Sequence, residues 1–474
     1  ANLGATWLNP STIREFLFET LNIPSYQSNI TVEFSHVTGE WKINNKNVLE
    51  DNPLVNTTYG TSGSSANGKN ALELCELALN LREAKIYDTV YVDGRERKKL
   101  NEKATLEARI KQQDLKDAFK KWLFADEKRS EKITEYYNRH FNSIKPREYN
   151  GEYLTFPGMT ADITLKKHQK DAVAHTLYGG NTLLAHCVGA GKTFEMIASA
   201  MESKRLGLAS KSLIVVPKHL TEQMGEDFQR LYPGAKVLVA TDKTFTAKNR
   251  EEFCSKIATQ NWDAVIMGYT QFEKIPLSLE RQKIILQEQI NEIIEGMEEY
   301  ADEYGKNNFT VKQMIRAQKK LESKLMSMNK QEKKDQTVVF EDLGIDRLYV
   351  DEAHYFKNLY TPTKLSNVAG IQTTEADKTM DFYQKCKYIN EITNCRGLVF
   401  ATGTPVSNSM TELYTMMRYL QYGELQERGL TQFDAWASVF GETVTASELA
   451  PEGTGYRQKT RFAKFFNLPE LMNL

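Results

Sequence analysis

The chain has 474 residues, of which 41% are hydrophobic and 26% charged, and its net charge is −1. This is the composition of a soluble globular protein long enough for about three domains. No apolar run approaches the roughly 20 residues that span a bilayer, and the N-terminus lacks a signal pattern, so we expect a cytoplasmic protein with no membrane partner. The five cysteines form no C-x-x-C pair, which argues against a zinc site or a disulfide framework.

Residues 1–157 are interpreted as an N-terminal accessory domain of mixed, mainly helical structure. The patterns predict a helix over Ser11–Leu21, two short strands within Thr31–Ile43, a helix from Ala71 to about Arg82, and helix over 101–142. The segment 95–147 is basic, with 16 Lys and Arg against 9 Asp and Glu. Such a segment could follow phosphates or form the solvated face of helices, and for a charge run alone we favour the second interpretation.

From about Thr160 short apolar runs alternate with helical segments. The runs are NTLLAH (181–186), SLIVVP (212–217), DAVIMGY (263–269), DRLYVDE (346–352) and GLVFATG (397–403). Continuous apolar strands between helices predict a parallel sheet that is covered on both faces, in a doubly wound α/β domain over 158–425. Ligands of such domains bind at the carboxyl ends of the strands.

An insertion at about 277–335 interrupts this alternation. Apolar residues recur at spacings of three and four on both sides of a GKNN turn (305–308), the first arm rich in Glu and the second in Lys and Arg. This pattern predicts an antiparallel helical hairpin. A hairpin that packs on its own domain is at least as good an interpretation as an arm that binds a partner.

The stretch CVGAGKT (187–193) follows the first apolar run and leads into a helix. In that position a glycine-rich turn and a helix N-terminus direct backbone N–H groups at an anion, and a lysine adds a positive charge on the β- and γ-phosphates. His186 stands where the longer phosphate-loop pattern has its first glycine. The sequence therefore predicts a nucleotide site that uses the shorter G-x-G-K-T core.

DEAH (351–354) follows the apolar run LYV, which places Asp351 at the carboxyl end of a strand. There the aspartate can hold Mg²⁺ through water, and Glu352 can orient or deprotonate an attacking water molecule. The alternative, an acidic helix N-terminus, explains the tetrapeptide less well because a phosphate loop precedes it.

The motifs together resemble those of the superfamily-two helicases, and they occur in the same order. They are LKKHQ (165–169), GAGKT (189–193), LIVVPKHLTEQMGEDF (213–228), VIMGYTQF (265–272), DEAHYFKN (351–358) and ATGTPVSNSMTELYTMMRYL (401–420). The last two are most similar to Swi/Snf-type DNA-dependent ATPases. Nearly the whole chain resembles the helicase region of large proteins of conjugative transposons and phages, which often also carry a DNA adenine methyltransferase.

The resemblance implies a RecA-like first helicase lobe that binds ATP and Mg²⁺. It also implies contacts to the backbone of duplex DNA, without recognition of the bases. Gln169 would read adenine, while Gly189, Ala190, Gly191, Lys192 and Thr193 would bind the triphosphate, with Thr193 and Asp351 on the metal. Catalysis would use Lys192, Asp351, Glu352 and His354, and His354 would couple hydrolysis to Thr402, Gly403 and Thr404. The implied DNA contacts are Pro217, Lys218, Tyr269, Thr270, Lys357 and Asn358.

The family also needs a second RecA-like lobe, and this chain shows no second sheet pattern before Leu474. We therefore expect residues 426–474 to begin a helical linker toward a second lobe of the full-length protein, and we expect the chain alone to bind ATP weakly and hydrolyse it poorly. An arginine supplied across the cleft accelerates related reactions by about 10³ to 10⁵. A methyltransferase domain or subunit is a further partner that the resemblance implies.

Three functional hypotheses follow from these patterns. The first is the ATP-binding lobe of a motor that translocates on duplex DNA, in mobile-element transfer or in modification and restriction. The second keeps the motor but makes it a strand-separating helicase, which the motifs cannot distinguish from the first. The third is a non-catalytic module that binds DNA or protein through the basic segment and the helical hairpin.

Overall fold

The computed structural model divides the chain into two compact units, which are described separately. The N-terminal unit comprises Ala1–Pro146, Leu365–Gly370 and Gly429–Leu474, and the sheet unit comprises Arg147–Lys364 and Ile371–Arg428. The described residues are 2–27, 29–35, 40–49, 51–64, 67–92, 95–142, 147–304, 309–330, 338–359, 368–369, 377–407, 409–449, 456–465, 467–472 and 474. No described helix is both long enough and apolar enough to cross a membrane.

The N-terminal unit begins with a layer of helices around one apolar core. Its first elements are α1 (Pro10–Thr20), β1 (Val32–Ser35), β2 (Glu40–Ile43), a π-helical turn (Leu54–Thr58), α2 (Ala71–Leu79), α3 (Glu102–Ala125) and α4 (Glu127–Tyr137), followed by a second π-helical turn (Asn138–Asn142). The core contains Phe16, Trp41 and Phe119, all at most 1% exposed. The predicted helices and the antiparallel β1–β2 pair are confirmed.

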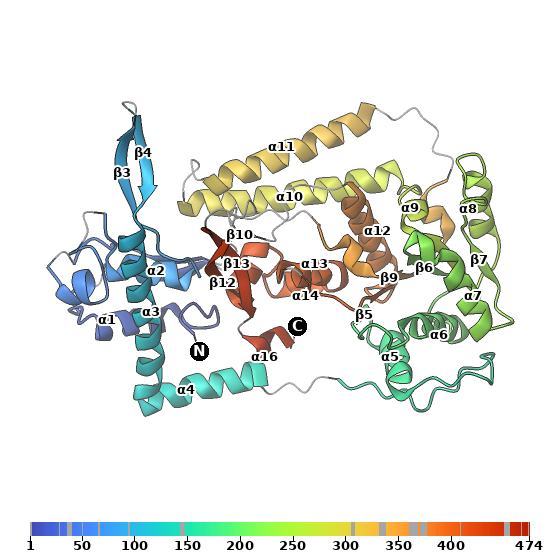
Figure 1. Cartoon of the computed structure of the whole chain (residues 1–474), viewed down its shortest axis with the longest axis horizontal. Coiled ribbons are helices and arrows are strands. Elements are labelled where there is room, and N and C mark those ends of the chain that lie inside the picture. The colour runs from blue at the N-terminus through green and yellow to red at the C-terminus, as the bar shows by residue number, and fades with distance from the viewer. Residues whose placement is uncertain are drawn as a thin grey trace. The chain divides into compact units, whose positions relative to one another are not determined.

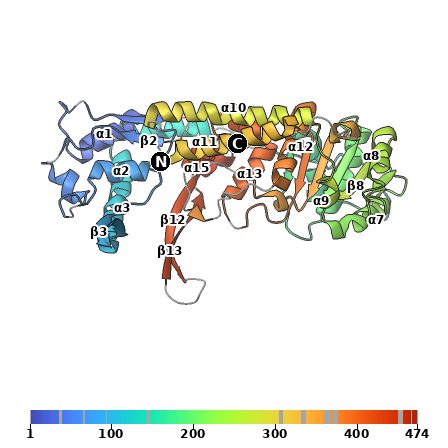
Figure 2. The same cartoon turned by 90° about the horizontal axis from the view of Figure 1, so that it is seen from above.

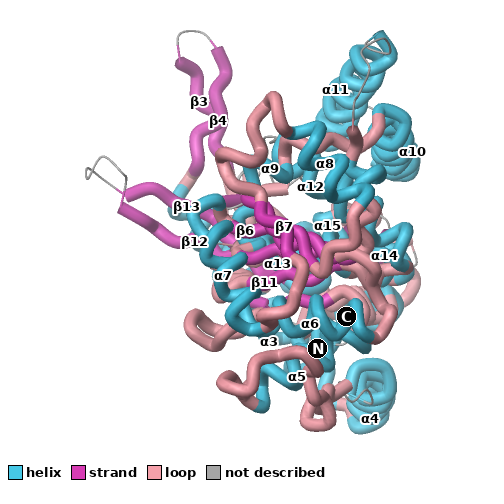
Figure 3. Tube along the Cα trace, turned by 90° about the vertical axis from the view of Figure 1, so that its right-hand side faces the viewer, coloured by secondary structure: helices cyan, strands magenta, loops and turns pink. Residues whose placement is uncertain are grey.

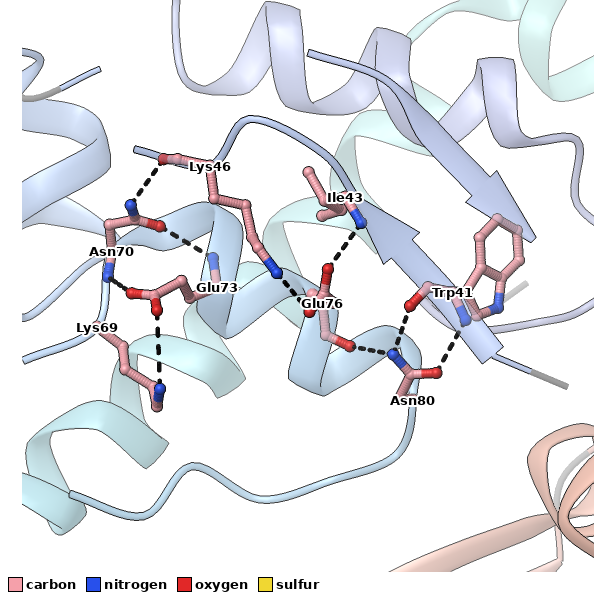
Figure 4. A network of polar contacts seen from close by, with 8 residues as sticks. All are labelled: Trp41, Ile43, Lys46, Lys69, Asn70, Glu73, Glu76 and Asn80. Atoms are coloured by element: carbon pink, nitrogen blue, oxygen red, sulfur yellow. Dashed lines mark hydrogen bonds and ion pairs between the residues drawn. The ribbon is translucent and has the colours of Figure 1, made fainter. Parts of the chain in front are cut away.

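A polar lock fastens α2 to the outer edge of β2 (Figure 4). Glu76 accepts hydrogen bonds from the backbone N–H of Ile43 at 2.7 Å and from Lys46 Nζ at 2.6 Å. The Asn80 amide accepts from the N–H of Trp41 at 2.9 Å and donates to its carbonyl at 2.7 Å. Side chains thus satisfy backbone groups that an edge strand would otherwise expose for pairing with another chain. We call Glu76, Asn80 and Lys46 the α2–β2 lock.

Two β-ribbons complete the N-terminal unit (Figures 1 and 3). The antiparallel pair β3 (Tyr87–Val92) and β4 (Arg95–Leu100) precedes α3, so the basic segment begins as a strand. Toward the C-terminus, α15 (Phe433–Phe440) leads into the antiparallel pair β12 (Gly441–Leu449) and β13 (Tyr456–Phe465), followed by α16 (Leu468–Met472). The prediction of a helical linker over 426–474 was wrong for this ribbon; β13 also pairs in parallel with β10 (Val368–Ala369).

The sheet unit contains a six-stranded sheet in which every pairing is parallel. In the sheet the strands run β5 (Thr182–Leu184), β11 (Leu398–Ala401), β9 (Arg347–Asp351), β6 (Ser212–Val216), β8 (Ala264–Gly268) and β7 (Val237–Val239). The five predicted strands are present and the doubly wound α/β class is confirmed. The sequence analysis missed β7 because its apolar run is only three residues long.

Alternate residues of each strand enter two separate apolar cores, as expected for a sheet covered on both faces. Leu213 and Val215 face one core, with Phe272 and Phe382 from helices, whereas Ile214 and Val216 face the other. Figure 3 shows the strands between the two helical layers. The helices are α5 (Lys167–Tyr178), α6 (Lys192–Arg205), α7 (Thr221–Leu231), α8 (Arg250–Thr259), α9 (Tyr269–Phe272), α12 (Asp377–Thr393), α13 (Thr411–Leu420) and α14 (Tyr422–Glu427).

The predicted helical hairpin is present as α10 (Leu279–Tyr304) and α11 (Phe309–Lys330), which lie side by side (Figures 1 and 2). The contact between the two helices buries Leu286, Ile290, Leu321 and Met328. All four belong to the apolar residues that recur at spacings of three and four in the sequence. The predicted turn at 305–308 lies outside the described residues. The first turns of α10 pack on the sheet unit, because Ile285 enters the sheet core and Lys387 on α12 forms an ion pair of 2.5 Å with Glu288.

Candidate functional site

The chemistry-bearing segments follow consecutive strands along one edge of the sheet. The phosphate loop follows β5, the Thr402–Thr404 segment follows β11, and the DEAH turn follows β9. Register aligns Ala401 with both Leu184 and Asp351, so the three strands end at the same level. The next two strands, β6 and β8, end at Val216 and Gly268, which also pair. The strand order therefore brings all the predicted segments to the carboxyl edge, where α/β domains bind ligands.

The phosphate loop ends in a left-handed glycine that begins α6. Gly191 has φ 89°, a conformation that favours glycine, and an ideal Cβ there would lie 2.2 Å from Gln169 Nε2, so a side chain would also displace Gln169. Lys192 is 8% exposed, and its ammonium donates to the carbonyls of His186 at 2.9 Å and Cys187 at 3.2 Å. The loop thus curls around the lysine head and leaves the N-terminus of α6 open for an anion.

Gln169 is held against the phosphate loop. Its Nε2 donates to the Ala190 carbonyl at 3.1 Å, and its Oε1 accepts from the N–H of Lys166 at 2.8 Å. His168 Nε2 also lies 3.0 Å from the Ala190 carbonyl. Gln169 therefore joins the start of α5 to the loop, and the residue is only 6% exposed. The sequence did not indicate the contact from His168.

The DEAH turn is strained at its second residue. Glu352 has φ 48° in the left-handed region, and its N–H donates to Asp351 Oδ1 at 3.0 Å. Asp351 is 8% exposed, and burial, reinforced by the Glu352 charge, raises the pKa of its carboxyl to about 6. The positive charges of Lys192 and His354 act in the opposite direction on that pKa. A buried carboxylate with a raised pKa lacks a cation, and a metal ion would supply one.

The segment after β11 lies between the loop and the DEAH turn. An ideal Cβ on Gly403 would lie 3.6 Å from Lys192 Nζ and 2.9 Å from Val188 Cγ2, so the segment lies directly against the phosphate loop. On the other side, His354 Nδ1 lies 3.0 Å from Thr402 Oγ1 and 3.1 Å from Glu352 Oε2. Thr402 Oγ1 also accepts the N–H of Thr404 at 3.1 Å. His354 thus connects the acidic pair to Thr402, as the resemblance implies.

A buried carboxylate beneath the loop was not predicted. Glu195, in the first turn of α6, is fully buried, and its Oε1 lies 2.8 Å from His186 Nδ1. Burial raises the pKa of Glu195, against the opposing effect of the nearby histidines. His186, which replaces the first glycine of the longer loop pattern, therefore has a structural partner. Only the return of the chain from strand to helix brings these two residues together, so the sequence pattern gave no signal for the pair.

The segments predicted to contact DNA through β6 and β8 are adjacent. An ideal Cβ on Gly268 would lie 3.2 Å from Lys218 Cα. Pro217 is half-buried, while Lys218 and Thr270 are exposed, and Lys218 forms an exposed ion pair of 3.0 Å with Asp242. Tyr269 differs from these residues because it is only 6% exposed, so the structure leaves Thr270 as the accessible member of its pair.

Lys357 is held inside the sheet unit. Its Nζ lies 3.0 Å from Glu412 Oε1 and donates to Ser407 Oγ at 2.6 Å, and its side chain is 15% exposed. Glu412 also accepts the N–H of Ser407 at 2.6 Å. This arrangement joins the turn after DEAH to the start of α13 and favours a structural role for Lys357. Asn358 is exposed.

The residues at the edge fit a magnesium–triphosphate ligand. The ideal Cβ of Gly189, at φ 85°, meets no described atom within 4 Å, so a phosphate can approach the loop backbone. Thr193 and Asp351 offer the hard oxygen ligands that Mg²⁺ prefers. The described residues contain no cluster of three or more His, Cys, Asp or Glu side chains that would cage a metal. Such an edge suits an ion that arrives with a phosphate ligand and keeps its water.

Family comparisons agree with this geometry. Residues 175–474 match a family described as a probable helicase domain, and residues 2–143 match a domain of unknown function. The first match covers both the phosphate loop and the DEAH turn. The second covers the α2–β2 lock and the basic segment as far as residue 143, and its description assigns no activity.

Single relatives are distant. The "Defense against restriction protein B" of Escherichia phage P1 is 23% identical over 405 residues, which are 76% of this chain and 18% of the phage protein. The chain thus spans less than a fifth of that relative. Among solved structures, a SWI2/SNF2 ATPase core of Sulfolobus solfataricus in complex with double-stranded DNA is 15% identical, covering 59% of this chain and 40% of that one at a TM-score of 0.32. T4 UvsW is 14% identical, with coverages of 60% and 37% and a TM-score of 0.28.

Proposed function

Since the chain belongs to the probable helicase domain family, we propose that its sheet unit is the ATP-hydrolysing lobe of a motor that moves along duplex DNA. One observation carries the proposal. The strand order β5–β11–β9 sets the phosphate loop, a threonine–glycine segment and an acidic turn side by side, so that Lys192 acts on the pKa of Asp351. Two sequence segments that are about 160 residues apart therefore contribute opposite charges to one site.

Each residue at this edge has a role in phosphoryl transfer. The loop amides and Lys192 bind and orient the β- and γ-phosphates. Thr193 and Asp351 would hold Mg²⁺, which would supply positive charge beside the phosphates. Glu352, whose carboxylate lies beside His354, orients the attacking water and accepts its proton. Gln169 binds adenine after it releases the Ala190 carbonyl, which is its partner in this structure.

The contact between His354 and Thr402 connects the nucleotide site to α13. Because His354 Nδ1 lies 3.1 Å from Glu352 Oε2 and 3.0 Å from Thr402 Oγ1, a change at the acidic turn changes the hydrogen bonding of the Thr402–Thr404 segment. The segment continues through Ser407 to Glu412 and the Lys357 ion pair. This chain of contacts is a physical route by which hydrolysis alters the rest of the lobe.

DNA binds along the continuation of the same edge. Lys218 and Thr270, exposed after β6 and β8, offer an ammonium group and a hydroxyl to the phosphates of one strand. Contacts of this kind position a strand without reading bases, which suits a motor that moves over any sequence. A second RecA-like lobe of the full-length protein would close the nucleotide site and supply arginine to it.

The biological setting is that of mobile DNA. The similarity to a phage protein named for defence against restriction supports a role in DNA transfer or in modification and restriction. Since the chain spans 18% of that relative, the activities of the whole protein, including any methyltransferase domain or subunit, are part of the proposal.

Turnover of ATP by the full-length protein, with and without duplex DNA, tests this function. We expect turnover that rises with DNA and that Lys192→Ala lowers by about 10² to 10³. Displacement of a third strand from a triplex, without separation of the duplex strands, would identify a translocase, and separation of the duplex strands would identify a helicase. If Lys192→Ala left every activity unchanged, the non-catalytic scaffold hypothesis would replace the motor.

A further inference from the structure

Tyr269 touches the acidic turn from the DNA side of the edge. Its hydroxyl lies 2.5 Å from the Asp351 carbonyl and 3.3 Å from the Glu352 carbonyl. A phenol has one proton, so the shorter contact to Asp351 is the donated hydrogen bond. Tyr269 therefore binds the backbone that carries both acidic residues.

The acidic turn needs such a support. Glu352 has φ 48°, a conformation that a non-glycine residue keeps only when its surroundings impose it. The donated hydrogen bond from Tyr269 fixes the carbonyl just before this residue. The N–H of Glu352, bonded to Asp351 Oδ1, fixes the same peptide from its other side. The direction of the Glu352 side chain consequently depends on where the Tyr269 hydroxyl stands.

The ring of Tyr269 is held firmly, so a backbone movement would be transmitted to its hydroxyl. It stacks on Tyr355 at 4.4 Å with an interplanar angle of 19° and meets the edge of Phe356 at 5.3 Å. Tyr269 begins α9, and the carbonyl that ends α9, that of Phe272, accepts a 2.9 Å hydrogen bond from the buried Lys385. Between these two fixed points lies Thr270, which is exposed.

We propose that Tyr269 is a positioning residue that couples DNA contact at Thr270 to the Asp351–Glu352 turn. When a DNA phosphate engages Thr270, the start of α9 shifts and the Tyr269 hydroxyl brings the Asp351 carbonyl into the geometry that aims Glu352 at the attacking water. The inference rests on the proposed function, since it presumes hydrolysis that DNA stimulates. It assigns to Tyr269 a role other than the DNA contact that the sequence resemblance implies.

Tyr269→Phe in the full-length protein tests the coupling, because it removes the hydroxyl and keeps the stacked ring. We expect kcat with saturating duplex DNA to fall about tenfold, as loss of one buried hydrogen bond implies. The ratio of DNA-stimulated to DNA-free turnover should fall by several-fold, while the KM for ATP and the DNA concentration for half-maximal stimulation stay within about twofold. Tyr232→Phe is the matched control, since the buried Tyr232 hydroxyl has no hydrogen-bond partner among the described residues.

A double-mutant cycle with Thr270→Ala separates coupling from simple support. If Thr270 acts through Tyr269, Thr270→Ala lowers stimulated kcat in the wild type but changes it little in Tyr269→Phe. Equal loss of stimulated and DNA-free turnover in Tyr269→Phe, or additive effects in the cycle, would overturn the coupling and leave Tyr269 a fixed support. Stimulation of Tyr269→Phe equal to that of the wild type would overturn the inference while the motor function stands. A wild type that hydrolyses no ATP refutes the motor function itself, and melting temperatures establish that each variant is folded.

Discussion

The α2–β2 lock and the carboxyl edge of the sheet are both dense clusters of polar residues, but they differ in what their groups bond. In the lock, Glu76 and Asn80 bond backbone groups of β2 and hold ordinary helix and strand conformations. At the edge, Gly191 and Glu352 are left-handed, and the Asp351 carboxyl has a raised pKa. Polar groups that satisfy one another stabilise a fold, whereas strained and electrostatically frustrated ones indicate a ligand. Substitutions should therefore separate the two clusters, one changing stability and the other activity.

The largest effect is expected from Glu352→Gln. A general base of this kind contributes about 10² to 10⁴ in rate, so kcat should fall by that factor while ATP still binds. The glutamine can keep an oxygen near His354, so the melting temperature should change little. Stopped-flow binding of a fluorescent ATP analogue, beside steady-state turnover, separates binding from chemistry. Full turnover in Glu352→Gln would show that another group activates the water.

Lys192→Ala should lower turnover by about 10² to 10³, the cost of removing one preorganised electrostatic contact. Unlike Glu352→Gln, it should also weaken ATP binding. Lys204→Ala is a matched control, because Lys204 lies at the other end of α6, where it pairs with Asp263. If both variants bound ATP as the wild type does, the loop would not be the phosphate site.

Asp381→Ala sharpens the comparison because it removes a structural polar group from the same unit as the site. Lys385 is fully buried, donates to Asp381 at 2.6 Å, and lies over the Phe272 ring at 4.3 Å. Loss of the carboxylate leaves a buried charge unpaired and should cost about 3 to 5 kcal/mol of unfolding free energy. The single variant Lys385→Met removes the buried lysine charge itself, so it should cost less than Asp381→Ala. Denaturant unfolding measures both, and equal costs would show that the lysine charge left without its carboxylate adds no penalty of its own.

How far the sequence predicted these clusters depends on how local their signals are. GAGKT and DEAH were recognised because each motif is contiguous and follows an apolar strand, and the sheet confirms those strands. The pairing of His186 with Glu195 and the hydroxyl contact of Tyr269 depend on how separate segments meet, which no spacing within a segment encodes. The ribbon β12–β13 was missed because residues 426–474 were interpreted from the family resemblance as the start of a linker, and not from their own pattern.

Glu76→Ala should destabilise the N-terminal unit and leave ATP turnover unchanged. The N–H of Ile43 would lose its acceptor, and an unsatisfied backbone donor costs about 1 to 3 kcal/mol. Glu76→Gln can still accept that hydrogen bond and loses only the ion pair with the half-buried Lys46, so its cost should be below about 1 kcal/mol. Thermal unfolding beside turnover measures the contrast. A loss of turnover in a folded Glu76→Ala protein would break the division between the two clusters.

Lys218→Ala should have the smallest effect, because its exposed pair with Asp242 contributes at most about 1 kcal/mol to stability. If Lys218 contacts a DNA phosphate, the variant should bind all sequences more weakly by the same factor, and the slope of log affinity against log salt should fall by about 1. Asp242→Ala offers the opposite sign, because it releases Lys218 from its partner and removes a negative charge beside the path of the strand. Titrations of one duplex at several salt concentrations measure both variants. Affinity that rises in Asp242→Ala and falls in Lys218→Ala would show that a DNA strand contacts the segment after β6. Two variants that bind as the wild type does would move the DNA path away from this part of the edge, because each lysine that contacts a phosphate releases counterions on binding, so its removal must weaken binding.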